Sequence, residues 1–544
     1  MQEQVRWSRR PFGVGFIAGL VAGVVASGVM MLFNVTLNGL SLPQEFGSEL
    51  LALMPAALFT FFHQAIGPDA KYYFFGIVLI GQCVVFALSG ALCNRYVNPQ
   101  NEPLRWSYGL LLALVLWLFA GLILLPLTGS GVFGANLSVG LENGLLSLAA
   151  VGLVFGLLFV FAQRWLVASQ AEKATDSGRR YQQEISPRRT LLKQIAVVTG
   201  IVAVGVGLWE FISQGLGGGS KVPVAQLLKS YQPKISPPPK PDYGTIQPVQ
   251  FLSPEITPND QFYIVSKNFT DPTVSAQEWS LKVTGLVEHP YTLSYSEMLA
   301  LPMQQQYESL ECISNTVGGS YMSNALWEGI RLDTFLQKAG GVKAGATKIV
   351  LHAYDDYTDS IHLSKALEPT TLVAVRMNGV TLPDGHGYPA RVLVPGIYGM
   401  KHVKWLTEIE VVNYDYQGYW QQRGWSDAAP VLLTSRIDTP LDGASVSAHK
   451  RTYIAGVAFS GNKGISEVDV SFDSGHTWQI ATLKKPLSQL TWVLWEISWT
   501  PKAPGNYTIV VRAIDMQGNV QNPTETPPQP NGASGYDSIS VTVA

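Results

Sequence analysis

Residues 307–340 read YESLECISNTVGGSYMSNALWEGIRLDTFLQKAG, and the rest of the sequence is organised around this stretch. It contains Cys312, the only cysteine beyond the hydrophobic N-terminal third of the 544-residue chain. Cys83 and Cys93 lie in or beside one apolar run, where a helix would separate them by about 15 Å, too far for a disulfide. Cys312 therefore has three interpretations: an inert core residue, a reactive nucleophile or a metal ligand.

The composition divides the chain into two sections. Charged residues make up 14% of the sequence and the formal net charge is −2, so the composition does not favour nucleic-acid binding. Apolar residues are concentrated before about residue 215. This asymmetry predicts a membrane section followed by a soluble section.

Five apolar runs are long enough to cross the hydrocarbon layer of a bilayer. These predicted spans are Phe12–Leu37, Tyr72–Leu92, Trp106–Leu127, Leu145–Trp165 and Leu191–Ile212. A further stretch, Leu50–Ile66, is ambiguous because it is short and contains Pro55 and His63. With five spans, nearly all basic residues of this section fall on one side, and a sixth span would break that pattern. We therefore expect Leu50–Ile66 to be re-entrant or interfacial, the N-terminus to lie inside and the C-terminus outside.

The predicted organisation is an all-α transmembrane bundle, then an α+β domain, then an all-β Ig-like sandwich. The boundaries are 1–170 for the membrane domain, 171–190 for a cytoplasmic loop, 191–213 for the last span, 214–247 for a Gly/Pro-rich linker, 248–420 for the α+β domain and 430–544 for the sandwich. Ser186–Lys193, SPRRTLLK, is either a twin-arginine export signal or a pair of arginines at the inner end of a span.

The soluble section alternates short strands, helices and loops. The predicted strands include Gln261–Val265, Trp279–Val283, Glu308–Ile313, Lys348–Ala353, Thr371–Met377, Pro389–Val394 and Glu408–Val412; the predicted helices are Ser294–Leu301 and Leu332–Ala339; and Tyr354–Ser360 is predicted to be a polar loop. From about Pro430, strand-length runs separated by turns predict the sandwich.

Basic side chains gather in the second half of the α+β domain, beside Gly396 and Gly399. Together with one residue further upstream, they are Lys267, His386, Arg391, Lys401, His402 and Lys404. Arginine and lysine together with exposed backbone N–H groups suit a phosphate, so an anionic ligand is expected here.

Four motifs resemble those of the sulfite oxidase family of molybdopterin enzymes. They are Glu311–Asn315 (ECISN), Ser323–Leu332 (SNALWEGIRL), His386–Arg391 (HGYPAR) and Gly399–Leu406 (GMKHVKWL), and the resemblance covers about Pro248 to Ala544. It implies a molybdenum–molybdopterin cofactor whose metal is bound by one protein thiolate, and Cys312 matches that ligand. A soft thiolate suits such a metal.

The resemblance also implies further site residues. Pterin-phosphate contacts match His386, Arg391, His402, Val403 and Lys404; other cofactor contacts match Asn315, Asp356, Lys267 and Asn268; and Tyr357 matches an active-site tyrosine. A neutral phenol at Tyr357 would donate a hydrogen bond to the oxo group or the substrate. A structural loop tyrosine is the alternative.

One departure from the family concerns the substrate. Sulfite-oxidising members follow the Cys-x-x-Asn motif with arginines, whereas this chain has Thr316-Val317-Gly318. The resemblance therefore implies a membrane-anchored oxidoreductase that transfers an oxygen atom to or from a small sulfite- or sulfoxide-type substrate outside the cytoplasmic membrane. The expected partners are a cytochrome or quinone-linked electron carrier, membrane lipid and a second copy of the chain as a homodimer. The alternative is a non-catalytic surface binding protein with a degenerate cofactor domain.

Overall fold

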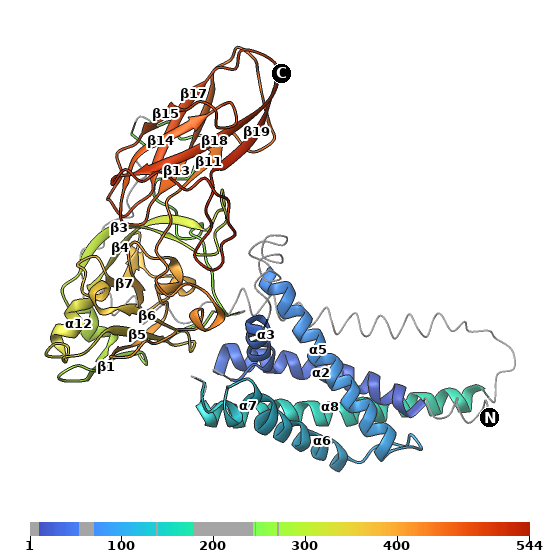
Figure 1. The fold of residues 1–544 in the computed structure, drawn as a ribbon. Coiled ribbons are helices and arrows are strands. Elements are labelled where there is room, and N and C mark those ends of the chain that lie inside the picture. The colour runs from blue at the N-terminus through green and yellow to red at the C-terminus, as the bar shows by residue number, and fades with distance from the viewer. Residues whose placement is uncertain are drawn as a thin grey trace. The chain divides into compact units, whose positions relative to one another are not determined.

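The computed structural model describes residues 10–37, 39–53, 70–137, 140–177, 243–244, 246–268 and 271–544. The chain forms two compact units, one N-terminal and helical, the other comprising the soluble section (Figure 1). The fifth predicted span, the twin-arginine-like motif, His63 and nearly all of the linker lie outside the described residues. Each unit is described by itself below.

Four long apolar helices dominate the N-terminal unit and coincide with four predicted spans. They are α2 (Arg10–Leu37), α5 (Ala70–Val97), α6 (Trp106–Phe119), which continues through the π-turn η2 (Ala120–Leu124) into α7 (Leu125–Leu127), and α8 (Gly140–Ser177). Each holds a segment long and apolar enough to span a membrane. α8 extends into the stretch predicted as the start of a loop at residue 171. The ambiguous segment 50–66 begins inside a helix, α3 (Leu42–Leu53), and the rest of it lies outside the described residues.

Polar side chains bring specific helix ends together in this unit. Asn94 near the end of α5 donates from Nδ2 to the carbonyl of Pro11 at the start of α2 (2.6 Å), and Gln163 of α8 donates to Asn94 Oδ1 (3.3 Å). Arg164 of α8 donates to the Leu104 carbonyl just before α6 (3.3 Å). α2 and α5 are therefore antiparallel, and the segment between them starts and finishes at the same end of the bundle.

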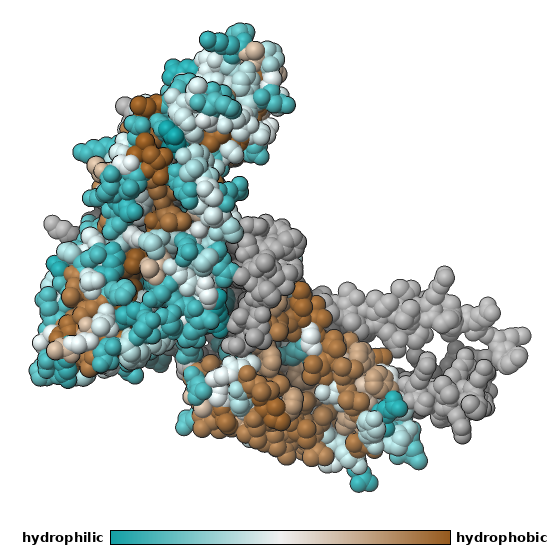
Figure 2. All heavy atoms as spheres, in the orientation of Figure 1, coloured by the Kyte–Doolittle hydropathy of each residue, from teal (hydrophilic) through white to brown (hydrophobic). Residues whose placement is uncertain are grey.

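Small residues allow the helices to pack closely. A Cβ atom added to Gly90 of α5 would lie 2.7 Å from the carbonyl oxygen of Gly15 in α2, and one added to Gly156 of α8 would clash with the carbonyl oxygen of Gly109 in α6. Such contacts are typical of helices that associate in lipid, where close van der Waals packing replaces the hydrophobic effect. The outward face of this unit is predominantly hydrophobic (Figure 2).

Two sheets form the first domain of the soluble unit. One has the order β2-β1-β10-β5-β6, with β1 (Ser280–Gly285) parallel to β10 (Leu406–Val412) and the other pairs antiparallel. The second has the order β3-β4-β7-β8, with β9 paired to β7. The remaining strands are β2 (Tyr291–Ser294), β3 (Gln304–Glu311), β4 (Met322–Arg331), β5 (Lys348–Ala353), β6 (Thr358–His362), β7 (Leu372–Met377), β8 (Val380–Thr381) and β9 (Arg391–Leu393).

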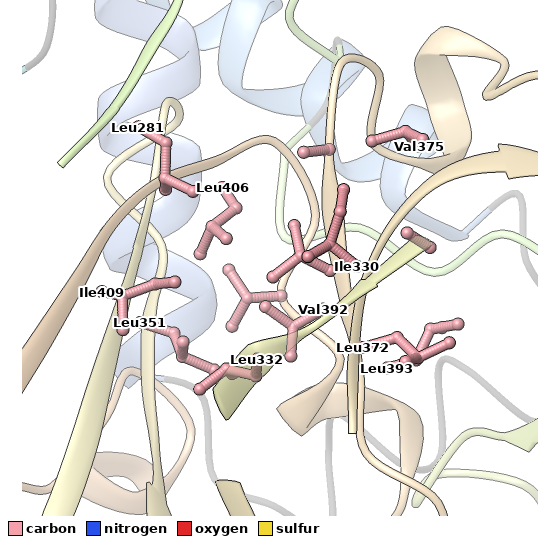
Figure 3. Packing of buried hydrophobic residues seen from close by; sticks show 14 of the residues in the cluster. Leu281, Ile330, Leu332, Leu351, Leu372, Val375, Val392, Leu393, Leu406 and Ile409 are labelled. Carbon is pink, nitrogen blue, oxygen red and sulfur yellow. The ribbon is translucent and has the colours of Figure 1, made fainter. Parts of the chain in front are cut away.

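The hydrophobic core of this domain lies between the two sheets. In Figure 3, Leu281, Leu351 and Ile409 come from the first sheet, and Ile330 and Val392 come from the second. All five are fully buried. At about 25 cal/mol per Å² of apolar surface, a core of this kind is the main stabilising term of the domain.

Short helices connect these strands. They are α11 (Tyr295–Leu299), α12 (Leu332–Lys338), α13 (Leu363–Ala366) and the 3₁₀ turns η4 (Asp384–His386), η5 (Gly399–Lys401) and η6 (Gln421–Arg423). The predicted helix at Ser294–Leu301 is confirmed, because Ser294 and Glu297 form a capping box at the start of α11. α12 is also confirmed, and the chain after it turns through Gly340, which has a positive φ of 81°.

Two local predictions are wrong. The segment Gln261–Val265 forms no strand; the N–H of Tyr263 donates instead to Ser323 Oγ (3.2 Å). The stretch Tyr354–Ser360 is not wholly a loop, because β6 begins at Thr358 and pairs with β5. Asp359 of this strand is buried in an ion pair with Lys401, and such a buried charge hides the strand from a hydrophobicity pattern.

The C-terminal domain is all-β and contains two sheets. Their orders are β11-β13-β17-β16 and β12-β19-β18-β14-β15. The strands are β11 (Thr434–Thr439), β12 (Ala444–Val446), β13 (Thr452–Phe459), β14 (Ile465–Ser471), β15 (Gln479–Ile480), β16 (Thr482–Leu483), β17 (Val493–Trp499), β18 (Gly505–Asp515) and β19 (Asp537–Val543). Buried side chains of both sheets, among them Trp495 and Val511, share one core.

The C-terminal domain covers the edge of β3 that is not paired with β4. Ser309 of β3 donates from its N–H to the Leu490 carbonyl (3.0 Å), and its hydroxyl accepts from the Trp492 N–H (2.9 Å). Ser488 Oγ donates to the Tyr307 carbonyl (2.7 Å). An edge strand needs such a partner for its backbone groups, and this one continues directly into the Cys312 loop.

Replacing Phe335 of α12 by alanine is expected to lower the free energy of unfolding by about 3–5 kcal/mol, because this fully buried ring packs in the core between the two sheets. Urea unfolding of the full chain in detergent, followed by near-ultraviolet circular dichroism, measures the change. Lys343→Ala, at an exposed position nearby, is the control and should change stability by less than about 0.5 kcal/mol. Equal losses in both variants would contradict this packing.

Candidate cofactor and active site

Cys312 occupies the point at which β3 ends. β3 and β4 pair up to Glu311 and Met322, so the chain leaves the sheet at Cys312 and returns ten residues later. The N–H of Cys312 donates to the Tyr321 carbonyl (3.0 Å), which closes this loop at its base. The sulfur lies 3.0 Å from Ser314 Oγ. Burial raises the pKa of the Cys312 thiol, although Ser314 partly opposes that effect, so the thiol is protonated at neutral pH unless a metal binds it.

Asn315 holds the Cys312 loop in shape. Its Nδ2 donates to Glu311 Oε1 (2.9 Å) and its Oδ1 accepts from the Tyr321 N–H (3.0 Å). Arg436 of β11 donates from Nη1 to the Gly319 carbonyl (2.6 Å), so the C-terminal domain fixes the far side of the loop. The Asn315 amide is thus occupied within the loop, where it orients Cys312.

Arg391 is a buried cation with incomplete hydrogen bonding. Its guanidinium lies over the Trp327 ring at 5.1 Å and donates to the carbonyls of His386 (3.2 Å) and His402 (3.4 Å), while Nε has no partner. Burial lowers its pKa to about 10, which still leaves it charged at neutral pH. Among the described residues, no carboxylate forms an ion pair with it. An unpaired buried charge is costly, so this site fits an anionic group such as a phosphate.

Two buried histidines surround Arg391, and both are neutral. Burial, reinforced by Arg391, lowers the pKa of His386 to about 4 and that of His402 to about 3. His386 Nε2 lies 3.0 Å from the Asn259 carbonyl. His402 Nδ1 accepts from the Val394 N–H (3.4 Å) and Nε2 donates to the Ile397 carbonyl (3.0 Å). His402 therefore uses both ring nitrogens on the backbone and holds the segments beside Arg391 together.

Val403 and Lys404 follow His402 in the chain and also lie near Arg391 and His386. The Val403 carbonyl accepts from the Val392 N–H (2.8 Å), which places this segment beside β9 and Arg391. Lys404 Nζ donates to the Gly385 carbonyl (3.1 Å), next to His386, and lies 4.2 Å from the centre of the Trp405 ring. Of the predicted basic cluster, His386, Arg391, His402 and Lys404 are therefore neighbours.

Lys401 does not belong to that cluster. Its side chain is fully buried and forms ion pairs with Asp359 and Asp427, both at 2.9 Å, and it also donates to the Ser360 carbonyl (2.8 Å). The expectation that it would contact an anionic ligand is not met, because two carboxylates already surround its charge. Sequence could not show this, since Asp359 and Asp427 are 42 and 26 residues away.

Tyr357 directs its hydroxyl group into the protein. Its Oη lies 2.7 Å from the Met400 carbonyl and 3.0 Å from Asp359 Oδ2. Burial and the charge of Asp359 raise its pKa well above the ordinary value, so the phenol remains neutral. Asp356, which precedes it, is exposed and has a positive φ of 61°. A direct bond from Tyr357 to a substrate would require its hydroxyl to give up one of these partners.

Lys267 and Asn268 belong to a short segment that groups with the N-terminal unit. Lys267 Nζ donates to Asn268 Oδ1 (3.0 Å). Their cofactor role stays a prediction.

Comparisons with known proteins identify the two domains of the soluble section. Residues 268–420 match the oxidoreductase molybdopterin binding domain, and residues 429–527 match the Mo-co oxidoreductase dimerisation domain. Mitochondrial sulfite oxidase from Macaca fascicularis is 31% identical over 319 residues, which are 50% of this chain and 58% of that protein. An uncharacterised oxidoreductase of Bacillus subtilis, YuiH, is 34% identical over 148 residues, which are 27% of this chain and 72% of YuiH.

The chain belongs to the sulfite oxidase family of molybdopterin-dependent oxidoreductases. Its cofactor is molybdenum–molybdopterin. The chain spans a little over half the length of the mitochondrial sulfite oxidases that it matches. A solved structure, the sulfane dehydrogenase SoxCD from Paracoccus pantotrophus, is 22% identical, with a TM-score of 0.46, and covers 52% of this chain and 80% of that one.

The sequence interpretation missed Tyr263. A Cβ atom on Gly399 would lie 2.8 Å from Tyr263 Oη and 3.2 Å from the Glu311 carbonyl, so the phenol lies beside the residue preceding Cys312. Burial raises the pKa of Tyr263 well above the ordinary value; a thiolate at Cys312 raises it further, whereas Arg391 lowers it. Tyr263 therefore interacts both with Cys312, the expected thiolate ligand, and with Arg391, which suits an anion. An aromatic pair in a short apolar run carries no chemical signature that would have revealed it.

Glu308 is a buried carboxyl group in the wall of the site, and Glu308→Gln is expected to change how stability depends on pH. Burial raises the pKa of Glu308 from 4.5 to about 8, and its Oε1 has no hydrogen-bond partner. A raised folded-state pKa gives a stability contribution that is complete below pH 4.5 and is lost as pH rises through 8. Between these values, wild-type stability should fall relative to the variant by up to about 1.4 kcal/mol per pH unit.

Urea unfolding at a series of pH values from 5 to 8 measures this difference for the full chain. Glu288→Gln, at an exposed position, is the control and should follow the wild type. Parallel curves for the wild type and Glu308→Gln would show that Glu308 is ionised in the folded protein.

Proposed function

We propose that the protein is a membrane-anchored molybdopterin oxidoreductase that transfers an oxygen atom to or from a small substrate outside the cytoplasmic membrane. The observation that carries the proposal is a buried cysteine at the end of β3 together with a buried arginine in the same domain that forms no ion pair with a carboxylate of the described residues. The cysteine offers a soft metal ligand, and the arginine offers a cation for the pterin phosphate.

The residues divide into those that hold the cofactor and those that support them. Cys312 would supply the thiolate to molybdenum, while Arg391, His386, Lys404 and the backbone at Val403 would bind the pterin phosphate. Asn315 and His402 would fix the Cys312 loop and the pocket wall. When bound, the cofactor supplies the two-electron oxygen-atom transfer, and the protein positions the substrate and excludes water.

The substrate is expected to be neutral and sulfoxide-like. The loop after Asn315 presents Thr316, Val317 and Gly318, none of which carries charge. Arg436, which reaches the same loop, is already ion-paired with Asp438 at 2.6 Å. Binding the sulfite dianion would call for additional positive charge at this point.

The helical unit supports the proposed membrane side. Arg10, Arg95 and Arg105 lie at the helix ends that the contacts of Asn94, Gln163 and Arg164 bring together. The positive-inside rule assigns this end to the cytoplasm. With a fifth span after α8, the soluble unit would lie outside.

Electrons would pass to or from an external carrier. The helical unit contains a cavity of about 540 Å³ lined almost wholly by apolar side chains, including Phe86 and Trp117, with Gln82 as one polar group. Such a lining suits an isoprenoid tail, which favours a quinone-linked carrier over a soluble cytochrome. The Ig-like C-terminal domain would join two copies of the chain as a homodimer.

Replacing Cys312 with serine is expected to abolish turnover with either sulfite or a sulfoxide, since the thiolate ligand is lost. Detergent-purified protein is assayed with an artificial electron carrier, and molybdenum is measured by elemental analysis. Cys83→Ser, in a membrane helix, is the matched control and should retain wild-type activity. Turnover that survives in Cys312→Ser would exclude thiolate ligation by Cys312, and wild-type protein without molybdenum would favour the non-catalytic binding protein.

The uncharged loop predicts that wild-type protein reduces a dialkyl sulfoxide with a higher kcat/KM than it shows for sulfite oxidation. Introducing positive charge with Val317→Arg should lower the KM for sulfite, through attraction between opposite charges. Initial rates with both substrates and the same artificial carrier provide the measurement. A wild-type preference for sulfite would overturn the neutral-substrate assignment and leave the enzyme assignment intact.

A further inference from the structure

A continuous line of titratable side chains runs from Tyr357 to solvent. Tyr357 Oη lies 3.0 Å from Asp359 Oδ2, and Asp359 Oδ1 accepts from Lys401 Nζ at 2.9 Å. Lys401 Nζ also donates to Asp427 Oδ1 at 2.9 Å. The four groups come from β6 and the turn before it, from η5 and from the segment that precedes the C-terminal domain.

The two ends of this line have different surroundings. At the inner end, Tyr357 also contacts the carbonyl of Met400, whose neighbour Gly399 packs beside Tyr263 and Glu311 at the Cys312 loop. At the outer end, the Asp427 side chain is 30% exposed, so water reaches it. Between these ends, the side chains of Asp359 and Lys401 are 0% and 2% exposed.

A buried ion pair of this kind is weak evidence of a stabilising role. Removing two charges from water costs several kcal/mol per ion, and well-packed apolar residues of similar volume often stabilise a fold equally well. The pair also receives further polar support: the Ser360 N–H donates to Asp359 Oδ1 (2.7 Å), and Lys348 holds Asp427 at 2.7 Å and the 74% exposed Asp415 at 2.5 Å. Burying the charges of Asp359 and Lys401 costs desolvation free energy, and a role in moving charge would explain why these side chains are charged.

From this geometry we infer that Tyr357, Asp359, Lys401 and Asp427 form a proton relay between the active site and solvent. The inference rests on the proposed function, in which oxidation of a substrate by water yields the oxygenated substrate, two protons and two electrons. The electrons leave one at a time to the external carrier and the protons need a separate exit. Reduction of a sulfoxide takes up the same protons in the opposite direction and releases water.

Each link can transfer a proton without creating an isolated charge. Tyr357 gives its hydroxyl proton to Asp359 as its oxygen takes one from the site, and Lys401 gives a proton to Asp427 as it accepts one from Asp359. Burial raises the pKa of Asp359 despite the opposing charge of Lys401, which makes this carboxylate a ready acceptor. Gln421 faces Asp359 from η6 (3.5 Å), and Asp355 faces Tyr357 from its own loop (3.2 Å from Oδ1 to the Tyr357 nitrogen).

Asp359→Asn and Asp427→Asn test the relay in the full-length holoprotein. Each is expected to lower kcat by about 10²-fold, the usual contribution of proton transfer, and to raise the solvent deuterium isotope effect, with KM unchanged. Added imidazole should restore the activity of Asp427→Asn, whose site water reaches, but not that of Asp359→Asn, whose site is buried. A purely structural role would not produce this difference in rescue.

Asp469→Asn is the matched control, because Asp469 is also buried and ion-paired, with Arg512 at 2.9 Å in the C-terminal domain. It should lower stability and leave kcat and the isotope effect at wild-type values. The relay is wrong if Asp359→Asn and Asp427→Asn behave like this control, or if imidazole rescues neither.

Infrared titration of the resting protein provides a readout that needs no turnover. A carboxylic-acid band missing from Asp359→Asn identifies Asp359, and Lys401→Met should move the titration of that band to higher pH because a neighbouring positive charge is lost. If the wild type turns over neither substrate, the proposed function fails and this titration alone decides the relay. An Asp359 band that titrates identically with and without Lys401 overturns it.

Discussion

A buried positive charge that the protein leaves incompletely neutralised is the constraint on which the site depends. Arg391 lies over Trp327, donates to two carbonyls and keeps Nε without a partner. A guanidinium in such surroundings is tolerated when an anion completes its interactions. Burial and the charge of Arg391 together keep both neighbouring histidines neutral, whereas burial keeps Glu308 protonated at neutral pH although Arg391 opposes it.

Around this charge, the fold assembles a site from segments far apart in the sequence. Cys312 follows β3 at the edge of one sheet, and β9, which pairs with β7 of the same sheet, delivers Arg391. The C-terminal domain then covers the edge of β3 and holds the Cys312 loop through Arg436. The domain that the comparisons assign to dimerisation thus also fixes the geometry of the thiolate within one chain.

Two kinds of buried charge coexist in this domain and serve different purposes. Arg391 is buried without a carboxylate and suits a ligand, whereas Lys401 is buried between two carboxylates and belongs to an internal network. Both side chains lie in the predicted basic cluster and are only ten residues apart, so composition alone cannot distinguish them. The carboxylates that neutralise Lys401 are 42 and 26 residues away in the sequence, so only the tertiary structure shows which of the two charges remains available.

The sequence by itself determined the family, the thiolate candidate and the four long apolar helices. Each of these depends on a local pattern in the sequence: a solitary cysteine in a distinctive motif, or an apolar run of membrane-spanning length. It also located most strands and the capped helix at Ser294. It could not locate Tyr263 at the site, the strand β6 or the ion pairs of Lys401. These features depend on which distant segments pack together, and only the tertiary structure decides that, because burial and ion pairing are properties of neighbours in space.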